Sequence, residues 1–292
     1  MLLNTLKTIY RHPFNRENKL GSLARFVKWQ VSSRLHPHPV LYRLTGRTQL
    51  IMWRGLTGAT GNLYCGLLEF EDMGFLLHFL RPTDLFVDVG ANVGVYTLLA
   101  AGEVGAQSIA VEPIPQTFAH LQQNIATNHL HTRVTAHNVG LGATNGSIQF
   151  TRSLDTVNHV ATADETDTID VPVTRLDDLL GEVPALIKID VEGFETEVLK
   201  GATRLLAAPT LRAIIIELNG SGARYGYDED RIHQQLLDEG FAPHTYDPKT
   251  RALIALPSYG RHNTIYLRDT AFVQDRVRTA RQVEIGPQGR RI

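Results

Sequence analysis

Carboxylates follow several apolar runs along this chain of 292 residues. Asp88 lies within the run Leu85–Val89, Glu112 and Asp190 each follow a short apolar run, and Glu217 ends another. When such runs are parallel strands, their carboxyl ends meet at one edge of the sheet. Carboxylates gathered there can accept hydrogen bonds from hydroxyl groups, bind a cation or remove a proton. The spacing therefore predicts a site built at strand ends.

Two glycines separate the first apolar run from a helical pattern. Gly90 and Gly94 allow the backbone to turn sharply after the strand, and the helix is expected to begin at Val95. A dinucleotide-binding turn needs Gly-x-Gly-x-x-Gly, but counting from Gly90 the second and third glycine positions hold Asn92 and Val95. The turn therefore predicts a nucleoside-type cofactor without a pyrophosphate and disfavours a nicotinamide oxidoreductase.

A second carboxylate stands at the expected distance from this turn. Glu112 ends the next apolar run, 24 positions after Asp88. A carboxylate at that strand end can accept hydrogen bonds from both hydroxyls of a ribose. Either motif alone is common in proteins, but the two in this order favour cofactor binding.

The Asp-x-Gly-x-Asn-x-Gly turn resembles the first motif of class I S-adenosylmethionine-dependent methyltransferases. Ile187–Glu195 is similar to the signature of the FkbM family of methyltransferases, Thr174–Leu179 to its Leu-Asp-Asp lead-in, and Ile214–Glu217 to its next strand. The resemblance covers about residues 69 to 268. It implies S-adenosylmethionine as cofactor and O-methylation, often of sugars in glycans, glycolipids and natural products.

The resemblance implies cofactor-binding positions on the strand ends and the turns after them. They are Asp88, Gly90, Ala91, Asn92, Gly94, Thr97, Glu112, Pro113, Asn138, Val139 and Asp190. For catalysis, removal of a hydroxyl proton needs a positioned base or a metal. By location the candidates are the carboxylates Asp190, Glu192 and Glu217, together with His159 in the loop Leu154–His159 that would overhang the cleft. Glu192 could instead support the following helix from its N-terminus.

A metal is left open. Asp190, Glu217 and Asn219 could imitate the Mg²⁺ ligands that related methyltransferase families place at these strand ends, but no metal ligand is assigned from the sequence. Lys188 alternates with two isoleucines in the signature strand and is expected to pair with a buried carboxylate. Glu195 and Glu197 are expected to face solvent.

Composition excludes several classes of protein. The formal net charge is −1, so no global field attracts nucleic acid. The single cysteine, Cys65, excludes an intrachain disulfide framework and a cysteine-based metal cluster. No apolar stretch approaches the roughly 20 residues of a membrane span, and a cytoplasmic location is expected. The oligomeric state is not indicated.

Alternating strand and helix patterns from Leu85 predict an α/β protein. The expected fold is the Rossmann-like class I methyltransferase fold, a mostly parallel seven-stranded sheet with helices on both faces. Residues 1–48 are expected as an N-terminal helical extension, 49–269 as the methyltransferase domain and 270–292 as a polar, solvated C-terminal tail. The extension is expected to pack on the domain, with a substrate lid or a weak membrane-surface contact as alternatives.

Two other functions stay open. The chain could encode a methyltransferase directed at nitrogen or at a peptide, or a catalytically silent binding module with this fold in glycan assembly. The intact Gly90, Gly94, Glu112 and Asp190 speak against a silent module. The acceptor itself carries no signature in the sequence.

Overall fold

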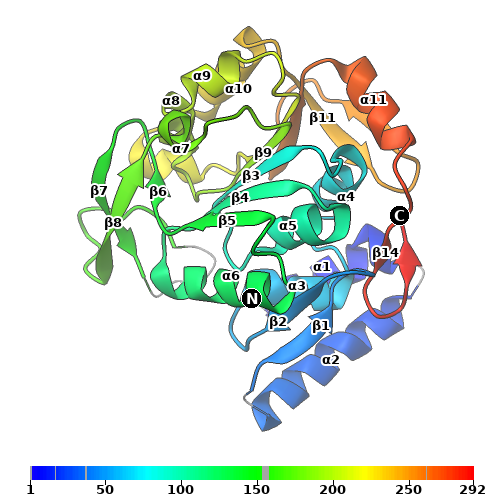
Figure 1. The fold of residues 1–292 in the computed structure, drawn as a ribbon. Coiled ribbons are helices and arrows are strands. Elements are labelled where there is room, and N and C mark those ends of the chain that lie inside the picture. The colour runs from blue at the N-terminus through cyan, green and yellow to red at the C-terminus, as the bar shows by residue number, and fades with distance from the viewer. Residues whose placement is uncertain (1, 17, 37, 153–157, 261) are drawn as a thin grey trace.

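A computed structural model describes residues 2–16, 18–36, 38–152, 158–260 and 262–292, and its centre is one twisted sheet (Figure 1). Eight strands form this sheet in the order β12-β11-β13-β10-β9-β3-β4-β5. In chain order they are β3 (Leu85–Val89), β4 (Gln107–Val111), β5 (Val134–His137), β9 (Leu186–Ile189), β10 (Ala213–Glu217), β11 (Ala242–Asp247), β12 (Ala252–Ala255) and β13 (Asn263–Leu267).

The first five of these strands are parallel, with β3 between β4 and β9. β13 runs antiparallel to β10 and to β11. This order and these directions are those of the predicted class I methyltransferase fold. The sheet has eight strands rather than the expected seven, because the chain folds back after β11 and adds β12 antiparallel to it at the edge.

Successive side chains of the parallel strands pack alternately into two apolar cores, one on each face of the sheet. Phe86 belongs to one core, whereas Val87 and Val89 belong to the other, as the two-residue period of a strand requires. Helices therefore cover both faces of the sheet. On the first face lie α4 (Phe70–Phe79), α5 (Val95–Thr97), which continues as the π-helix η2 (Leu98–Val104), α6 (Pro115–Thr127) and α11 (Thr270–Arg278).

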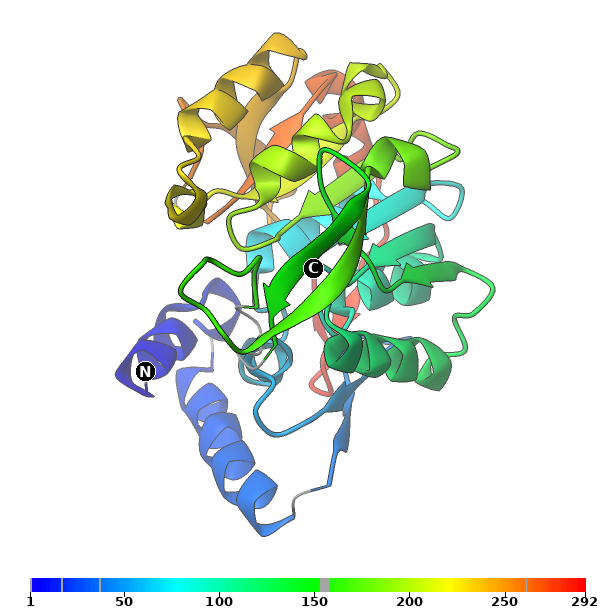
Figure 2. The same ribbon diagram turned by 90° about the vertical axis from the view of Figure 1, so that its left-hand side faces the viewer.

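The second face is covered by the segments around the signature strand. They are α7 (Leu176–Leu179), α8 (Glu195–Lys200), α9 (Thr203–Ala207) and α10 (Glu229–Asp238), and the short 3₁₀ helix η4 (Ser221–Tyr225) precedes α10. A separate three-stranded sheet is inserted between β5 and α7. It consists of β6 (Gly140–Leu141), β7 (Gly146–Thr151) and β8 (Thr168–Thr174) and stands at the side of the molecule (Figures 1 and 2).

The N-terminal residues are helical, as predicted, and pack on the same core as the sheet. They form α1 (Leu2–Arg11), η1 (Pro13–Asn15), α2 (Lys19–Leu35), β1 (Val40–Arg43), β2 (Gln49–Met52) and α3 (Thr57–Cys65). Phe14, Phe26 and Trp29 are buried in the first core together with Phe75 of α4. The extension is therefore held by apolar packing along much of its length.

Residues 270–292 are not the solvated tail that their arginines suggested. α11 buries Val273 and Val277, and a small hairpin of β14 (Glu284–Ile285) and β15 (Arg290–Arg291) follows. The expectation failed because several of the arginines are used in contacts with the rest of the protein. Arg276 pairs with Asp84, Arg281 pairs with the buried Glu103, and Arg290 lies 3.9 Å from the ring centroid of Phe14. The division at residues 48 and 269 stays a prediction.

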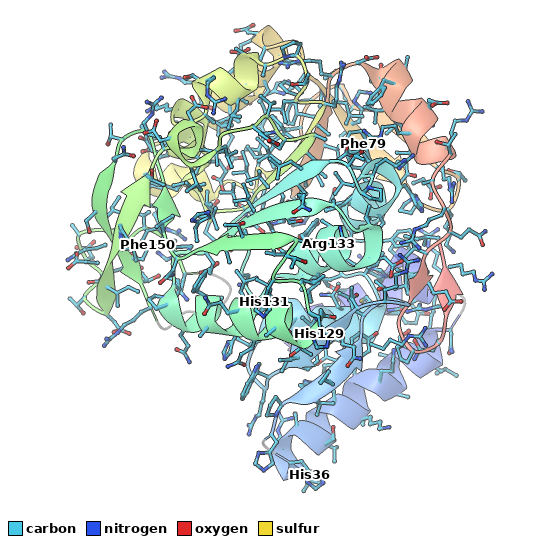
Figure 3. The ribbon with its side chains drawn as sticks, in the orientation of Figure 1. His36, Phe79, His129, His131, Arg133 and Phe150 are labelled. Carbon is cyan, nitrogen blue, oxygen red and sulfur yellow. The ribbon has the colours of Figure 1, made fainter. Side chains whose placement is uncertain are left out.

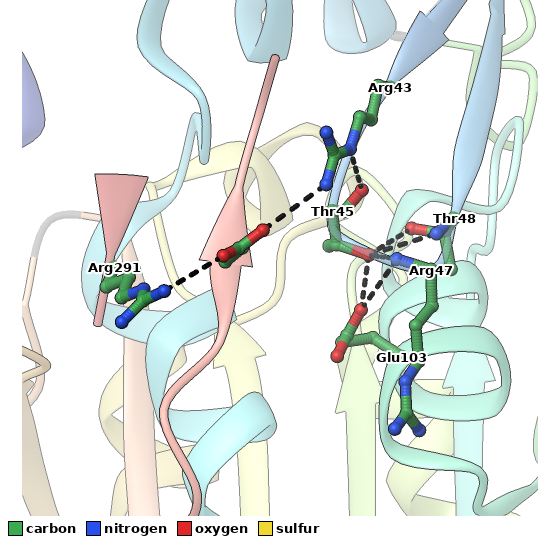
Figure 4. Close-up of polar contacts among 7 residues, drawn as sticks. Arg43, Thr45, Arg47, Thr48, Glu103 and Arg291 are labelled. Carbon is green, nitrogen blue, oxygen red and sulfur yellow. Dashed lines mark hydrogen bonds and ion pairs between the residues drawn. The ribbon is translucent and has the colours of Figure 1, made fainter. Parts of the chain in front are cut away.

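Polar contacts join the N-terminal segment to the C-terminal hairpin and to η2 (Figure 4). Arg43 of β1 and Arg291 of β15 both donate to Glu284 of β14. Beside them the hydroxyl of Thr45 donates to the buried Glu103 of η2, 2.6 Å away. Among the described residues, no helix is both long and apolar enough to cross a membrane.

Candidate cofactor and acceptor site

A cavity of about 400 Å³ opens at the carboxyl ends of β3, β4, β9 and β10. Its volume falls within the roughly 300–1,000 Å³ of small-molecule sites. Gly58 and Asn62 of α3, Glu69 beside α4 and Phe150 of β7 complete its wall. Figure 3 labels Phe150 on the hairpin at the left of the view. Elements from all parts of the chain therefore meet at this sheet edge, where the sequence predicted a site.

The glycine turn after β3 forms the floor of the cavity. Gly90 and Ala91 both donate their backbone N–H to the carbonyl of Val111, at 3.0 and 2.9 Å. Gly90 has a φ of +75°, and a Cβ atom added there would lie 1.8 Å from the backbone oxygen of Asp190. A side chain at position 90 would therefore collide with the backbone after β9 even without a ligand. A ligand depends on Gly90 because this close approach of the two strand ends shapes the cavity floor.

Asp88 lies at the bottom of the cavity with one oxygen engaged. Its Oδ2 accepts the backbone N–H and the hydroxyl of Thr97, at 3.0 and 2.7 Å. Its Oδ1 is buried and has no hydrogen-bond partner among the described residues. Burial raises the pKa of Asp88, although Lys188 and Thr97 oppose the shift. An unpartnered buried oxygen in a cavity wall is suited to a donor group on a ligand.

Glu112 stabilises the neighbouring loops and can still accept further hydrogen bonds. One oxygen accepts the N–H of Asn92 and the other that of Ile114, both at 2.9 Å. Burial raises the pKa of the Glu112 carboxyl group to about 7. Because an ionised carboxylate has about four acceptor positions, two remain for a pair of hydroxyls. The predicted ribose-binding position is thus compatible with the geometry.

Three carboxyl groups form an acidic cluster on the other side of the cavity. Single oxygens of Asp190, Glu192 and Glu217 lie within 4.8 Å of one another. Burial and the charge of Asp190 raise the pKa of Glu192 to about 7. Burial, Asp190 and then Glu192 raise that of Glu217 to about 8. Such groups exchange protons near neutral pH, which ordinary surface glutamates do not.

Lys188 is the cation of this site. Its Nζ lies 2.9 Å from Oδ2 of Asp190 and 4.9 Å from the ring centroid of Tyr96. Burial alone would lower the pKa of Lys188, but Asp190, Glu69 and Asp88 raise it above its ordinary value. Lys188 is therefore charged and partly neutralises three carboxylates. Lys188 thus pairs with a carboxylate as expected, but that carboxylate, Asp190, is only partly buried.

Glu192 and Glu195 both contribute to the turn that follows β9. Glu192, a candidate by location for which helix support was the alternative, adopts a φ of +55° before Gly193, which turns the chain so that Glu192 lines the cavity. Glu195 was expected to face solvent, but it is buried and accepts the N–H groups of Val191 and Gly193. In the sequence, the glycine at position 193, so soon after the end of an apolar strand, was the signal that could have identified this turn.

The structure divides the predicted site residues into two groups. Nine lie on the cavity wall: Asp88, Gly90, Ala91, Asn92, Glu112, Pro113, Val139, Asp190 and Glu217. Three support that wall from behind. Gly94 begins α5 with a φ of +89°, Thr97 holds Asp88, and Asn138 donates to the carbonyls of Glu112 and Pro113.

His159 does not lie on the cavity wall. It is buried, and its Nε2 lies 3.0 Å from Glu165 in the segment that connects β7 to β8, whereas its neighbour Asn158 lines the cavity. Residues 153–157 of the predicted substrate loop lie outside the described residues. Asn219 accepts the N–H of Ser221 and is not among the described residues that line the cavity, whereas Glu192 lies beside Asp190 and Glu217.

The polar atoms that line the cavity are mostly oxygens, and they fall into two groups. The glycine turn, Asp88 and Glu112 line one side of the cavity, and the acidic cluster faces the same space. Three carboxylates are also a donor set that Mg²⁺ accepts, but Lys188 already neutralises Asp190, and we assign no metal. The fold and this site together define an α/β group-transfer protein of the class I methyltransferase type.

Comparison with known proteins identifies the family. The methyltransferase FkbM domain matches residues 88–243. The chain is 35% identical over 148 residues to Methyltransferase 1 of Beauveria bassiana, covering 41% of this chain and 59% of that protein. It is 31% identical to the hexuronic acid methyltransferase AglP of Haloferax volcanii, covering 52% and 62%. The chain thus spans about three fifths of the length of these two relatives.

A third relative is matched over more of its length. It is the 31-O-demethyl-FK506 methyltransferase FkbM of Streptomyces tacrolimicus, 30% identical, with 51% of this chain and 72% of the relative covered. A solved structure of a methyltransferase FkbM from Methylobacillus flagellatus aligns with a TM-score of 0.45 and 18% identity over 72% of this chain and 52% of that one. The chain belongs to the FkbM methyltransferase family.

Proposed function

We propose that this protein is an S-adenosylmethionine-dependent O-methyltransferase whose acceptor is a hydroxyl group on a sugar, a glycan or glycolipid, or a related natural product. One observation carries the proposal. The nucleoside-type cleft around Glu112 and the acidic cluster around Glu217 line the same cavity of about 400 Å³. A methyl donor and a hydroxyl acceptor need such a shared space, because the transfer is an in-line displacement.

The residues present fit S-adenosylmethionine. Glu112 would accept the ribose hydroxyls, and the turn Gly90–Val93 would face the amino-acid tail. The unpartnered Oδ1 of Asp88 is suited to the ammonium group of that tail, since an ionised donor makes the stronger hydrogen bond. When bound, this cofactor supplies a methyl group on a positively charged sulfur.

The acidic cluster would act on the acceptor. A sugar hydroxyl is a weak nucleophile at neutral pH, so a base that removes its proton accelerates attack. Glu217, with a pKa of about 8, is the best base by its ionisation. A general base works best when its pKa lies near the operating pH.

Asp190 has a different role from the one expected. Because its Oδ2 is already held by Lys188, Asp190 is the fixed negative charge of the site and raises the pKa of Glu217. We assign the proton transfer to Glu217 and the positioning of the acceptor to Asp190. His159 lies outside this arrangement.

The relatives support the choice of a hydroxyl acceptor. One relative is named for hexuronic acid and another for an oxygen of FK506. A base with a raised pKa suits such an acceptor better than an amine, which is nucleophilic once neutral and needs less assistance. The nitrogen-directed alternative therefore ranks below O-methylation, and turnover would exclude the silent binding module.

Calorimetry with the full chain tests the cofactor. We expect S-adenosylmethionine and S-adenosylhomocysteine to bind and NAD not to bind. Glu112→Gln should weaken binding about 10- to 100-fold, because hydrogen bonds to a charged group contribute about 1.5–3 kcal/mol. Glu182→Gln, on an exposed loop, is the control. Tight NAD binding, or unchanged affinity in a folded Glu112→Gln protein, would contradict the assignment.

Release of S-adenosylhomocysteine tests the acceptor. The panel should contain methyl glycosides of hexuronic acids, neutral hexosides and simple amines. We expect release with glycosides above the rate of cofactor hydrolysis. Turnover of amines alone would replace the hydroxyl assignment with the nitrogen-directed one.

A further inference from the structure

The outward face of α2 carries apolar side chains where a surface helix normally carries polar ones. Leu20, Val27, Val31 and Leu35 are 82, 56, 53 and 70% exposed. At 100° per residue these four positions and Ala24 fall within one narrow stripe. The buried residues Ser22, Phe26, Trp29 and Ser33 lie on the opposite side, against the protein. We call the outward set the α2 stripe.

Cations border the α2 stripe on both sides. Lys28 and Arg34 are exposed and flank it on the helical wheel, and Lys19 lies at its first turn, 4.1 Å from the ring centroid of Tyr10, which is half exposed. No acidic residue occurs in α2. An apolar stripe between cations is the pattern of a helix that lies in a membrane interface.

The N-terminal segment that contains α2 and the rest of the chain have opposite formal charges. Residues 1–48 contain nine basic residues and one acidic residue, a formal charge of +8. The other 244 residues contain 20 basic and 29 acidic residues, a formal charge of −9. A surface of negative charge would therefore attract the N-terminal segment and repel the rest of the molecule.

The placement of α2 leaves this face accessible. α2 projects from the body of the molecule, and the labelled His36 marks its far end, well away from the central sheet (Figures 2 and 3). A second cavity of about 230 Å³ opens between α2 and α3, and both Arg34 and Arg54 line it. More cationic charge thus lies at the edge of the α2 stripe.

We infer that the α2 stripe docks the protein on the surface of an anionic lipid bilayer. The apolar side chains would enter the interface, and Lys28 and Arg34 would contact lipid headgroups. α3 lies between α2 and the cavity, and its Gly58 and Asn62 line that cavity. Docking would therefore hold the cavity near the membrane, within reach of a lipid-anchored acceptor. This last consequence rests on the proposed methyl transfer, whereas the docking does not.

Vesicle sedimentation with the full chain tests the docking. We expect binding to vesicles of mixed phosphatidylglycerol and phosphatidylcholine, little binding to phosphatidylcholine alone, and weaker binding at high salt. Lys28→Glu/Arg34→Glu should lower the partition coefficient at least about 25-fold, because each basic residue near an anionic surface contributes about fivefold. Val27→Asp/Val31→Asp should lower it about tenfold or more.

Matched variants control for added charge elsewhere. Ile254→Asp, at a site 49% exposed on β12, and Arg231→Glu, on α10, should bind vesicles as the unchanged protein does. Circular dichroism should show the same melting temperature for all variants. Equal binding to both kinds of vesicle, no binding, or binding unaffected by the α2 substitutions would overturn the inference. So would a dimer in lipid-free light scattering that Val27→Asp/Val31→Asp dissociates, since the α2 stripe would then face a second copy of the chain.

Discussion

At the residue scale, the neighbours of each carboxyl group decide what it does. Glu112 is held by two backbone N–H groups, and Asp190 is held by Lys188. Glu217 has mainly other carboxyl groups beside it, and its pKa is raised to about 8. Three side chains of similar chemistry are thus suited to binding, to fixed negative charge and to proton transfer.

The assignment of Glu217 as base predicts a specific loss of activity. Glu217→Gln should lower kcat by about 10²- to 10⁴-fold, the range for a removed general base, while affinity for the cofactor changes little. In the unchanged protein, kcat/KM should rise with pH as the carboxyl group loses its proton, with an apparent pKa near 8, because burial, Asp190 and Glu192 raise this pKa more than Lys188 lowers it. Initial rates across pH measure both effects.

The same substitution should change how stability depends on pH. Because the folded pKa of Glu217 exceeds its ordinary value of 4.5, its contribution to stability is fully present below pH 4.5 and is lost as the pH rises through about 8. Urea unfolding should therefore show Glu217→Gln gaining stability relative to the unchanged protein over this window. Glu182→Gln should show no such trend. Near-normal turnover of Glu217→Gln would move the role of base to Glu192 or Asp190.

At the scale of elements, the site depends on how closely the ends of β3 and β9 approach. The backbone of Gly90 runs against the carbonyl of Asp190, which closes the floor of the cavity. The next turn, at Glu192 and Gly193, also uses left-handed backbone to bring a carboxylate inward. Loop backbone, more than side-chain choice, therefore sets the shape of the cavity.

This close approach predicts a difference between two glycines of similar conformation. Gly90 and Gly220 have φ of +75° and +90°, but a Cβ atom at Gly220 would meet nothing within 4 Å. Gly220→Ala should cost only the left-handed strain of about 1–2 kcal/mol. Gly90→Ala adds a collision and should cost about 1–3 kcal/mol more. Urea unfolding of both variants measures the difference, and equal losses would show that the strand ends separate easily.

At the scale of the whole molecule, the two ends of the chain complete one core. The ring of Phe14 stacks on Phe70 of α4 at 5.2 Å, and the guanidinium of Arg290 covers it. Ile285 and Ile292, near the C-terminal end of the chain, belong to the same apolar core. Segments far apart in the sequence are therefore expected to unfold together.

Because this core is shared, we expect Phe14 to contribute as much to the free energy of unfolding as a buried residue of the sheet does. Phe14→Ala should lower the free energy of unfolding by about 3–5 kcal/mol, the usual cost of truncating a buried phenylalanine. Phe272→Ala, at a position 40% exposed on α11, is the control and should cost much less. Chemical unfolding followed by circular dichroism measures both. A separate early transition for the N-terminal segment would show that residues 1–48 are only loosely attached.

The sequence by itself determined the features that depend on local order along the chain. Strand, glycine turn and helix follow one another from Leu85 to Thr97, and Glu112 lies at the end of the next strand; such patterns need only alternating burial and backbone freedom. The family, the α/β fold and the edge of the sheet that carries the site followed from them.

Tertiary structure decided what depends on contacts between distant segments. The pairing of Lys188 with Asp190, the inward turn of Glu192 and the exclusion of His159 from the cavity arise where separate elements pack together. The burial of residues 270–292 has the same origin, because a polar sequence conceals the few apolar residues, such as Val273 and Ile285, that the core accepts. Tertiary structure also decided the ionisation of Glu217, because the pKa of Glu217 depends on carboxylates that follow another strand.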